Sequence, residues 1–159
     1  MSDNRRFHLA TRPEGVPSTD TFDLREVDRP DPAPGEALVR VLYLSVDPYM
    51  RDRMRAGESY AQPWEVGDPL RGGAVCEVVE SNGAGFEPGD TVVGELPWAE
   101  YATASGADLT PVDTGGLPVS TALGVLGMPG RTAYFGTREV AEPKADDWLV
   151  VSGAAGAVG

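Results

Sequence analysis

The stretch EALVRVLYLSV, residues 36–46, decides the fold class of this chain. It is a run of β-favouring residues, and similar runs occupy 72–81, 90–96 and 98–105. Between these runs lie segments such as SNGAGFEPGD, whose Gly, Pro, Asn and Asp residues suit the restricted or positive φ angles of turns. Residues 1–118 therefore predict a mainly-β domain, and a barrel or sandwich is the natural way to close so many short strands.

A helical pattern starts near residue 118, where apolar residues recur at helical spacing. Ser120 or Thr121 is placed to start a first helix, and Pro129 interrupts before a second. A turn and an apolar strand of about five residues follow. Helix, strand and glycine-rich turn are the opening of a parallel α/β unit, so we expect residues 119–159 to begin a second domain.

The last ten residues, VVSGAAGAVG at 150–159, read as a buried strand that runs into a glycine-rich turn. A dinucleotide-binding turn needs small residues at three points, for the sharp turn, for close approach to the pyrophosphate and for helix packing. Gly156 and Gly159 fit the last two points, and Ala154 stands where the usual pattern has its first glycine. The match is imperfect, and the helix that would hold the pyrophosphate would follow Gly159, so these 159 residues alone do not complete the site.

The charge of the chain limits its partners. Its 159 residues carry 25 acidic and 13 basic side chains, which give a net charge of −12, and a surface of this sign disfavours nucleic acid. Lys144 is the single lysine beside twelve arginines. Two interpretations stay open: adaptation to high salt, which screens self-repulsion, or a genome whose base composition favours arginine codons.

The compartment follows from what the sequence contains. No apolar run approaches the length of a membrane span, and the first residues, MSDNRRFHLATRPEG, lack the apolar core of a secretory signal. We therefore expect a cytoplasmic protein without a membrane segment. Cys76 is the single cysteine, which excludes an internal disulfide and predicts a small core residue, and His8 is expected in a strand or on the surface.

Several long stretches closely resemble one family. They are RPEGVPSTDTFDL (12–24), LSVDPYMRDRM (44–54), GDTVVGELPWAEY (89–101), LGMPGRTAYFG (126–136) and VVSGAAGAVG (150–159). In this order they resemble the medium-chain reductases that saturate the carbon–carbon double bond of enones, the group of prostaglandin, alkenal and curcumin reductases. The resemblance covers essentially the whole chain, and it is far more specific than the glycine turn alone.

The resemblance implies a fold and a truncation. It implies a GroES-like β-barrel over residues 1–118, followed by the first helices and strand of a Rossmann α/β domain over 119–159. Such enzymes run to more than twice this length, so the chain is expected to be the first half of one, cut at the phosphate-binding loop. Intact relatives pair through the edge of the Rossmann sheet, which implies a homodimer.

The resemblance also implies NADPH-dependent reduction of the C=C bond of α,β-unsaturated ketones or aldehydes. Tyr49 matches a family tyrosine that lines the substrate cleft, and Tyr60 matches a second one; for both, a core residue with a polar tip is the alternative. The family's main tyrosine near the reacting carbonyl would lie beyond Gly159. The catalytic residue is therefore unknown in this chain, and the 159 residues alone are expected to be inactive.

The cofactor side of the site is implied by the segment GMPGRTAY and by the terminal turn. Met128 and Thr132 match positions that approach the cofactor, with core packing as the alternative for Met128 and helix capping for Thr132. The expected NADPH contacts in the turn are Ala154, Ala155, Gly156, Ala157, Val158 and Gly159.

Zinc is disfavoured, because zinc-dependent alcohol dehydrogenases of the wider superfamily need Cys and His ligands that one Cys and one His cannot supply. We therefore expect no metal site. Two other functions stay open. One is a quinone oxidoreductase of the same superfamily, which differs in its substrate, and the other is a stand-alone GroES-like binding module without catalytic activity.

Overall fold

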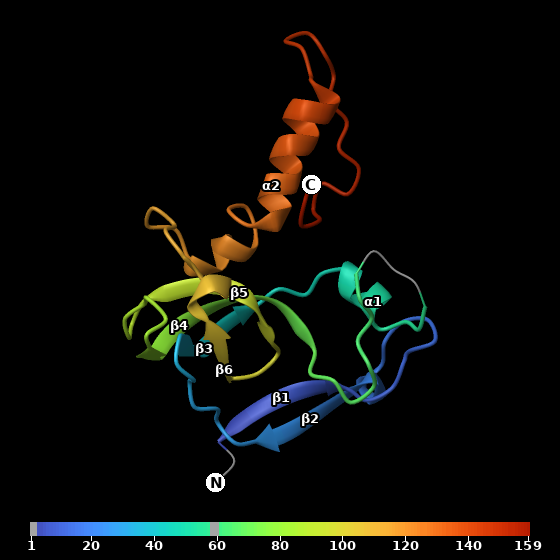
Figure 1. Ribbon diagram of the computed structural model, residues 1–159. Coiled ribbons are helices and arrows are strands. Elements are labelled where there is room, and N and C mark those ends of the chain that lie inside the picture. Colours follow the sequence, from blue (N-terminus) through green and yellow to red (C-terminus); the bar gives the residue numbers. More distant parts are fainter. Residues whose placement is uncertain (1–2, 58–60) are drawn as a thin grey trace. The chain divides into compact units, whose positions relative to one another are not determined.

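The computed structural model describes residues 3–57 and 61–159 (Figure 1). The chain divides into two compact units, residues 1–111 and 112–159. The domain boundary expected at residue 118 falls inside the second unit, just before a 3-10 helix at Val119–Leu123. The assignment of the two units to a barrel domain and a Rossmann domain stays a prediction.

The first unit is mainly β, as predicted. Its strands are β1 (Asn4–Leu9), β2 (Phe22–Val27), β3 (Glu36–Leu44), β4 (Arg71–Asn82), β5 (Thr91–Pro97), β6 (Tyr101–Ser105) and β7 (Thr110–Pro111). The short helix α1 (Tyr49–Arg53) joins β3 to β4, and 3-10 helices lie at Thr19–Thr21 and Gly106–Asp108. The runs predicted at 36–46, 72–81, 90–96 and 98–105 correspond to β3, β4, β5 and β6.

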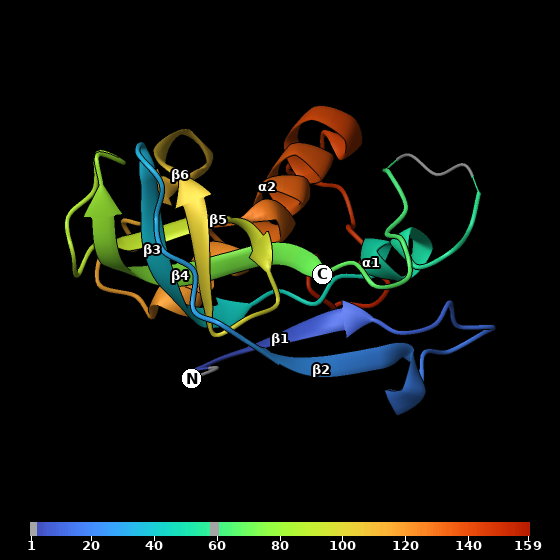
Figure 2. The ribbon, with the colours of Figure 1, turned by 60° about the horizontal axis from the view of Figure 1, so that its bottom comes forward.

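The strands form two antiparallel sheets. The larger sheet has the order β6-β3-β4-β5-β7, and β1 pairs with β2 in a separate ladder (Figure 2). The free edge of β1 does not stay unpaired: the Phe7 amide donates to the Trp98 carbonyl (2.9 Å), and the Leu70 amide donates to the Phe7 carbonyl (3.0 Å). β1 thereby joins the small sheet to the segments that flank β4 and β6.

Two clusters of buried side chains hold the first unit together. One lies on the larger sheet, and its members are Ala37, Val39, Ala74, Cys76, Val78, Val92, Leu96, Ala102, Ala104 and Leu109. The other lies beneath α1 and contains Leu9, Met50, Met54, Trp64 and Leu70. Every second residue of a strand lies on the same face, and Ala74, Cys76 and Val78 of β4 all belong to the first cluster. Cys76 is therefore the small core residue that the sequence predicts.

The helices of the second unit differ from the prediction. The first predicted helix is only the 3-10 helix Val119–Leu123, and the α-helix α2 (Met128–Phe135) begins before Pro129 instead of after it. Proline is well tolerated in the first turn of a helix, because the amide it lacks would have no partner there. Six further residues, Gly136–Ala141, continue as a π-helix.

The predicted strand near residues 148–152 is wrong, since this segment is irregular and exposed. Trp148 and Val150 have exposed fractions of 97% and 90%. A β-strand needs a neighbouring strand for its backbone hydrogen bonds, and the described part of the second unit has none. The ordered feature just before this segment is a turn, in which the Lys144 amide donates to the Asp147 carboxylate (2.7 Å).

Candidate functional site

The candidate substrate residue Tyr49 opens α1, directly after the chain leaves β3. The connection is ordered by polar contacts: the Ser45 hydroxyl donates to the Asp47 carboxylate (2.7 Å), and the Asp47 amide donates to the Met50 sulfur (3.4 Å). Pro48 precedes the helix with a helical φ of −55°. Tyr49 itself is half-buried and packs on the cluster beneath α1, so it lies at the border between that cluster and the surface.

Helix α1 rests directly on β4. Met50 is the buried residue of this helix, with 2% of its surface exposed. A Cβ on Gly72 of β4 would overlap the Met50 methyl group, and it would lie 3.2 Å from the indole nitrogen of Trp98 and 3.3 Å from the Ser45 carbonyl. The absence of a side chain at Gly72 therefore allows α1, and with it Tyr49, to approach the sheet closely.

The end of α1 is fixed by Arg53. Its guanidinium lies over the ring of Trp64, 4.7 Å from the centroid, in a cation–π arrangement. The same group donates to the Gln62 carbonyl (3.1 Å) and to the Glu95 carboxylate of β5 (3.1 Å). Tyr60, the second candidate substrate residue, lies outside the described residues, so its role stays a prediction.

Met128 and Thr132 both belong to α2 in the second unit. Met128 is the first residue of the helix and half its surface is exposed, so it is not a core residue of the described chain. Thr132 lies inside the helix, where its hydroxyl donates to the Met128 carbonyl (2.8 Å), so it does not cap the start of α2. The two candidate residues are thus neighbours on one turn.

The terminal residues form a compact turn in the second unit. Gly153 has a φ of +67°, and the Gly156 amide donates to the Gly153 carbonyl (2.8 Å). A Cβ on Gly156 would lie 3.0 Å from that carbonyl oxygen, and one on Gly159 would overlap it. Glycine is therefore favoured at these two positions, and residues 154–159, which include Val158, are all exposed. An exposed, tight backbone turn is what a diphosphate requires, and the role of this turn in binding a cofactor stays a prediction.

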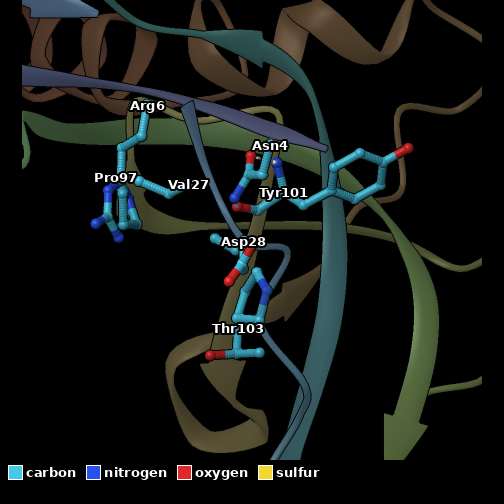
Figure 3. Close-up of a pocket in the computed structure, with 9 residues that line it drawn as sticks. Asn4, Arg6, Val27, Asp28, Pro97, Tyr101 and Thr103 are labelled. Atoms are coloured by element: carbon cyan, nitrogen blue, oxygen red, sulfur yellow. Dashed lines mark hydrogen bonds between the residues drawn. The ribbon is translucent and has the colours of Figure 1, made fainter. Parts of the chain in front are cut away.

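A small pocket of about 180 Å³, lined by polar and apolar side chains alike, lies in the first unit and was not predicted from the sequence (Figure 3). Arg6 and Thr103 lie at opposite ends of it, and Asn4, Asp28 and Tyr101 lie between them. The buried Asn4 amide donates to the Tyr101 carbonyl (2.9 Å), and its oxygen accepts from the Tyr101 amide (3.0 Å). Asn4 therefore replaces a backbone partner between β1 and β6, which is a structural role.

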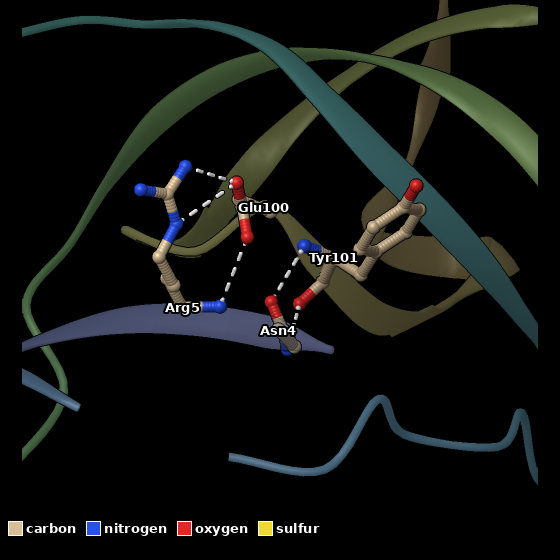
Figure 4. A network of polar contacts seen from close by, with 4 residues as sticks. All are labelled: Asn4, Arg5, Glu100 and Tyr101. Atoms are coloured by element: carbon tan, nitrogen blue, oxygen red, sulfur yellow. Dashed lines mark hydrogen bonds and ion pairs between the residues drawn. The ribbon is translucent and has the colours of Figure 1, made fainter. Parts of the chain in front are cut away.

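The next residue pair forms an ion pair in the same network (Figure 4). The Arg5 guanidinium donates to the Glu100 carboxylate at 2.6 and 3.1 Å, and the Arg5 amide donates to the other carboxylate oxygen (3.1 Å). The hydrogen bond between the side chains lowers the pKa of Glu100 and raises the pKa of Arg5. Both groups are solvent-exposed, so this ion pair contributes little to stability. Its contacts align β1 with the segment at Glu100.

His8 and Cys76 were weighed as metal ligands in the sequence. His8 lies in β1 as predicted, but it is buried rather than on the surface: its Nδ1 is 2.7 Å from the Gly67 carbonyl, and its Nε2 accepts from Arg6 (3.0 Å). Burial raises the pKa of the Cys76 thiol to about 12. Within residues 3–57 and 61–159, no three His, Cys, Asp or Glu side chains come together to hold a metal ion.

In chain order, a mainly-β unit with a tyrosine-bearing helix is followed by a helix and a tight glycine turn. Residues 5–112 match the family described as the N-terminal domain of oxidoreductase, and the chain belongs to this family. Among the described residues, no helix is long and apolar enough to cross a membrane.

Relatives of known name cover the chain almost completely. It is 46% identical over 155 residues to the putative NADP-dependent oxidoreductase YfmJ of Bacillus subtilis and 46% identical over 156 residues to the NADPH-dependent curcumin reductase of Escherichia coli. Each alignment covers 98% of this chain and 45% of the relative. The crystal structure of CurA from Vibrio vulnificus in complex with NADPH shares 44% identity, with a TM-score of 0.89, over 97% of this chain and 46% of that one. The chain thus spans about half the length of the curated relatives it matches.

Proposed function

We propose that this chain is the N-terminal half of an NADPH-dependent reductase that saturates the C=C bond of α,β-unsaturated ketones and aldehydes. The observation that carries the proposal is the similarity to an NADPH-dependent curcumin reductase across both units, at 46% identity over 98% of the chain. It includes the helix that presents Tyr49 and the tight turn at 153–159. The fold alone would not favour one reaction, because the same fold hosts several activities.

In this proposal, some candidate residues contact the enone and others contact NADPH. NADPH supplies the hydride that is added to the β-carbon of the enone, and a proton completes the reduction at the α-carbon. In the proposal Tyr49 lines the enone side of the cleft, where the apolar cluster beneath α1 keeps its ring in place. Tyr60 is a second candidate on that side. Because a developing negative charge on the carbonyl oxygen needs a donor in a dry site, a tyrosine is a suitable side chain there.

The second unit holds the cofactor in this proposal. The turn formed by Ala154, Ala155, Gly156, Ala157, Val158 and Gly159 offers exposed backbone to the diphosphate. Met128 and Thr132 approach the nicotinamide side. No residue of the described chain is assigned to a metal, so the activity is proposed to be zinc-independent.

The finer features of the whole protein belong to the same proposal. The substrate is a small enone or enal, with a quinone as the alternative, and neither nucleic acid nor a membrane is a partner. The intact protein is proposed to be a cytoplasmic homodimer. The first 111 residues would then be the substrate side of each subunit and the residues from 112 onward would begin the NADPH-binding side.

A chimera tests the proposal. Residues 1–159 replace the matching N-terminal part of the Escherichia coli curcumin reductase, and NADPH oxidation is followed with an enone, an enal and a quinone. We expect NADPH-dependent reduction of the enone and enal that survives dialysis against a chelator. The 159-residue chain alone should show no turnover, because the turn at 153–159 lacks the helix that completes a diphosphate site.

Three results would contradict parts of the proposal. A folded chimera without enone reduction would refute the assignment of this half to that reaction, and the parent curcumin reductase serves as the positive control. Reduction of a quinone alone would favour the alternative substrate. Turnover by the 159-residue chain on its own would show that the second half is not required.

A further inference from the structure

Arg51 makes an unusual set of contacts at the centre of α1. Its Nε donates to the Gly15 carbonyl (2.8 Å), and its Nη2 donates to the Pro13 carbonyl (2.8 Å). The planar guanidinium thus donates to two backbone carbonyls of one loop. These carbonyls belong to residues 36 and 38 positions earlier in the sequence. A positive φ of +88° at Gly15 shapes this loop.

The charge of Arg51 has no partner of opposite sign in the described chain. Arg12 and Arg53, its neighbours in space or sequence, form ion pairs with Glu65 and Glu95. Within residues 3–57 and 61–159, no carboxylate forms an ion pair with Arg51, and its Nη1 is buried without a hydrogen-bond acceptor. Among the described residues, the carbonyls of Pro13 and Gly15 are the acceptors of the Arg51 guanidinium, so its contribution is sought in these two contacts.

A second arginine connects the same two segments, with its side chain on the loop side and its acceptor at the end of α1. Arg12, which precedes the loop at 13–15, donates to the Met54 carbonyl just after α1 (3.3 Å). The loop at 12–15 and the helix at 49–53 are therefore cross-linked at both ends. On its other side α1 is seated by Met50 against Gly72. Helix α1 is only five residues long, so these contacts, and not its own hydrogen bonds, fix its position.

We propose that Arg51 is a positioning residue for Tyr49: it holds α1 against the loop at 13–15 so that the tyrosine two residues earlier keeps its place on the substrate side. This inference rests on the proposed function. Arginine suits the task because its rigid fork can serve two carbonyls at once, whereas the single ammonium of lysine has no such geometry. A displacement of a catalytic group by about 1 Å can cost up to about 100-fold in rate.

The test uses the chimera with three variants. Arg51→Lys keeps the charge and loses the fork, Tyr49→Phe removes the hydroxyl, and the matched control is Arg55→Lys, which alters an exposed arginine near the same helix. We expect Arg51→Lys to lower kcat/KM for an enone by about tenfold or more, since misplacement of a catalytic group has effects of this size. Arg55→Lys should leave it unchanged.

A double-mutant cycle separates positioning from a general structural role. If Arg51 acts through Tyr49, then Tyr49→Phe lowers kcat/KM in the parent chimera. In the Arg51→Lys background, the same substitution causes little further loss of kcat/KM. A merely structural Arg51 would give multiplicative losses. Multiplicative losses, or an Arg51→Lys chimera with the kinetics of the parent, would overturn the inference.

The inference remains testable even if the chimera does not reduce enones. Tyrosine signals in NMR spectra of the 159-residue chain report the surroundings of Tyr49 directly. We expect Arg51→Lys to shift the Tyr49 signal and Arg55→Lys to leave it in place, and the Tyr49→Phe variant assigns the signal. An unmoved Tyr49 signal in a folded Arg51→Lys chain would refute the positioning role independently of the proposed reaction.

Discussion

Cys76 shows how burial decides the chemistry of one residue. It lies in β4 with none of its surface exposed, and desolvation raises the pKa of its thiol to about 12. Because the thiolate is the reactive form, we expect Ellman's reagent at pH 8 to leave the folded chain unmodified and to react with one thiol per chain after unfolding in guanidinium chloride. Rapid labelling of the folded chain would contradict this burial.

Cys76 also makes the free energy of unfolding depend on pH. The pKa is higher in the folded state than in the unfolded state, so the neutral thiol stabilises the fold below a pH of about 8.5, the usual cysteine pKa. This contribution is lost as the pH rises toward 12. Urea unfolding of the wild-type chain and of Cys76→Ala should therefore diverge least at the alkaline end.

The sequence predicted the roles of some single residues and missed the contacts of others. The motif around Tyr49 could be read from the sequence, since it depends on neighbouring letters. The contact between Arg51 and the loop at 13–15 could not, because its partners are 36 and 38 residues away and are backbone carbonyls that any residue carries. The burial of His8 was missed for the same reason, as its acceptor at Gly67 is distant in sequence.

At the level of elements, the turn after β6 depends on one glycine. A Cβ on Gly106 would overlap the Ala84 carbonyl oxygen and lie 2.8 Å from its carbon, and both are backbone atoms that cannot turn aside. We expect Gly106→Ala to lower the free energy of unfolding by about 2–3 kcal/mol, the upper part of the range for overpacking. Urea unfolding measures it.

The neighbouring position supplies the control for this substitution. Ala107 is exposed in the same 3-10 helix, so Ala107→Ser should change the free energy of unfolding by less than about 0.5 kcal/mol. Equal effects of the two substitutions would mean that the close approach between this helix and the turn at 83–85 is not present in solution.

Elements with strong local patterns were predicted, and those that depend on distant partners were not. The runs that form β3, β4 and β5 are rich in valine and bounded by turn residues. β1 and β2 were missed because NRRFHL and FDLREV are strongly charged. The two strands pair with each other, and β1 also pairs with the segments at 67–70 and 98–100. The predicted strand near 148–152 failed for the converse reason, since an apolar run without a neighbour forms no ladder.

The whole molecule carries a net charge of −12, and the two explanations for it predict different responses to salt. If the acidic surface is an adaptation to high salt, the melting temperature should rise between dilute and molar KCl, because screening to about 3 Å at 1 M removes self-repulsion. Thermal melting followed by circular dichroism measures this. An unchanged melting temperature would favour arginine-rich codon usage as the explanation.

A charge-reduced variant makes the salt test specific. Asp31→Asn, Glu80→Gln and Glu139→Gln change three exposed acids, none of which is in a described ion pair, and take the net charge from −12 to −9. The rise in melting temperature with KCl should be smaller in this variant than in the wild-type chain. An equal rise in both would point to a general effect of salt on apolar burial.

The turn at 144–147 has a practical consequence for anyone who handles this protein. Lys144 is the single lysine of the chain, and it is exposed in the second unit. Amine-reactive dyes, crosslinkers and sensor surfaces will therefore attach at one side chain besides the α-amino group. A fluorophore on the Lys144 side chain lies in the second unit and leaves the first unit unmodified, and blocking the α-amino group beforehand restricts immobilisation to this one side chain.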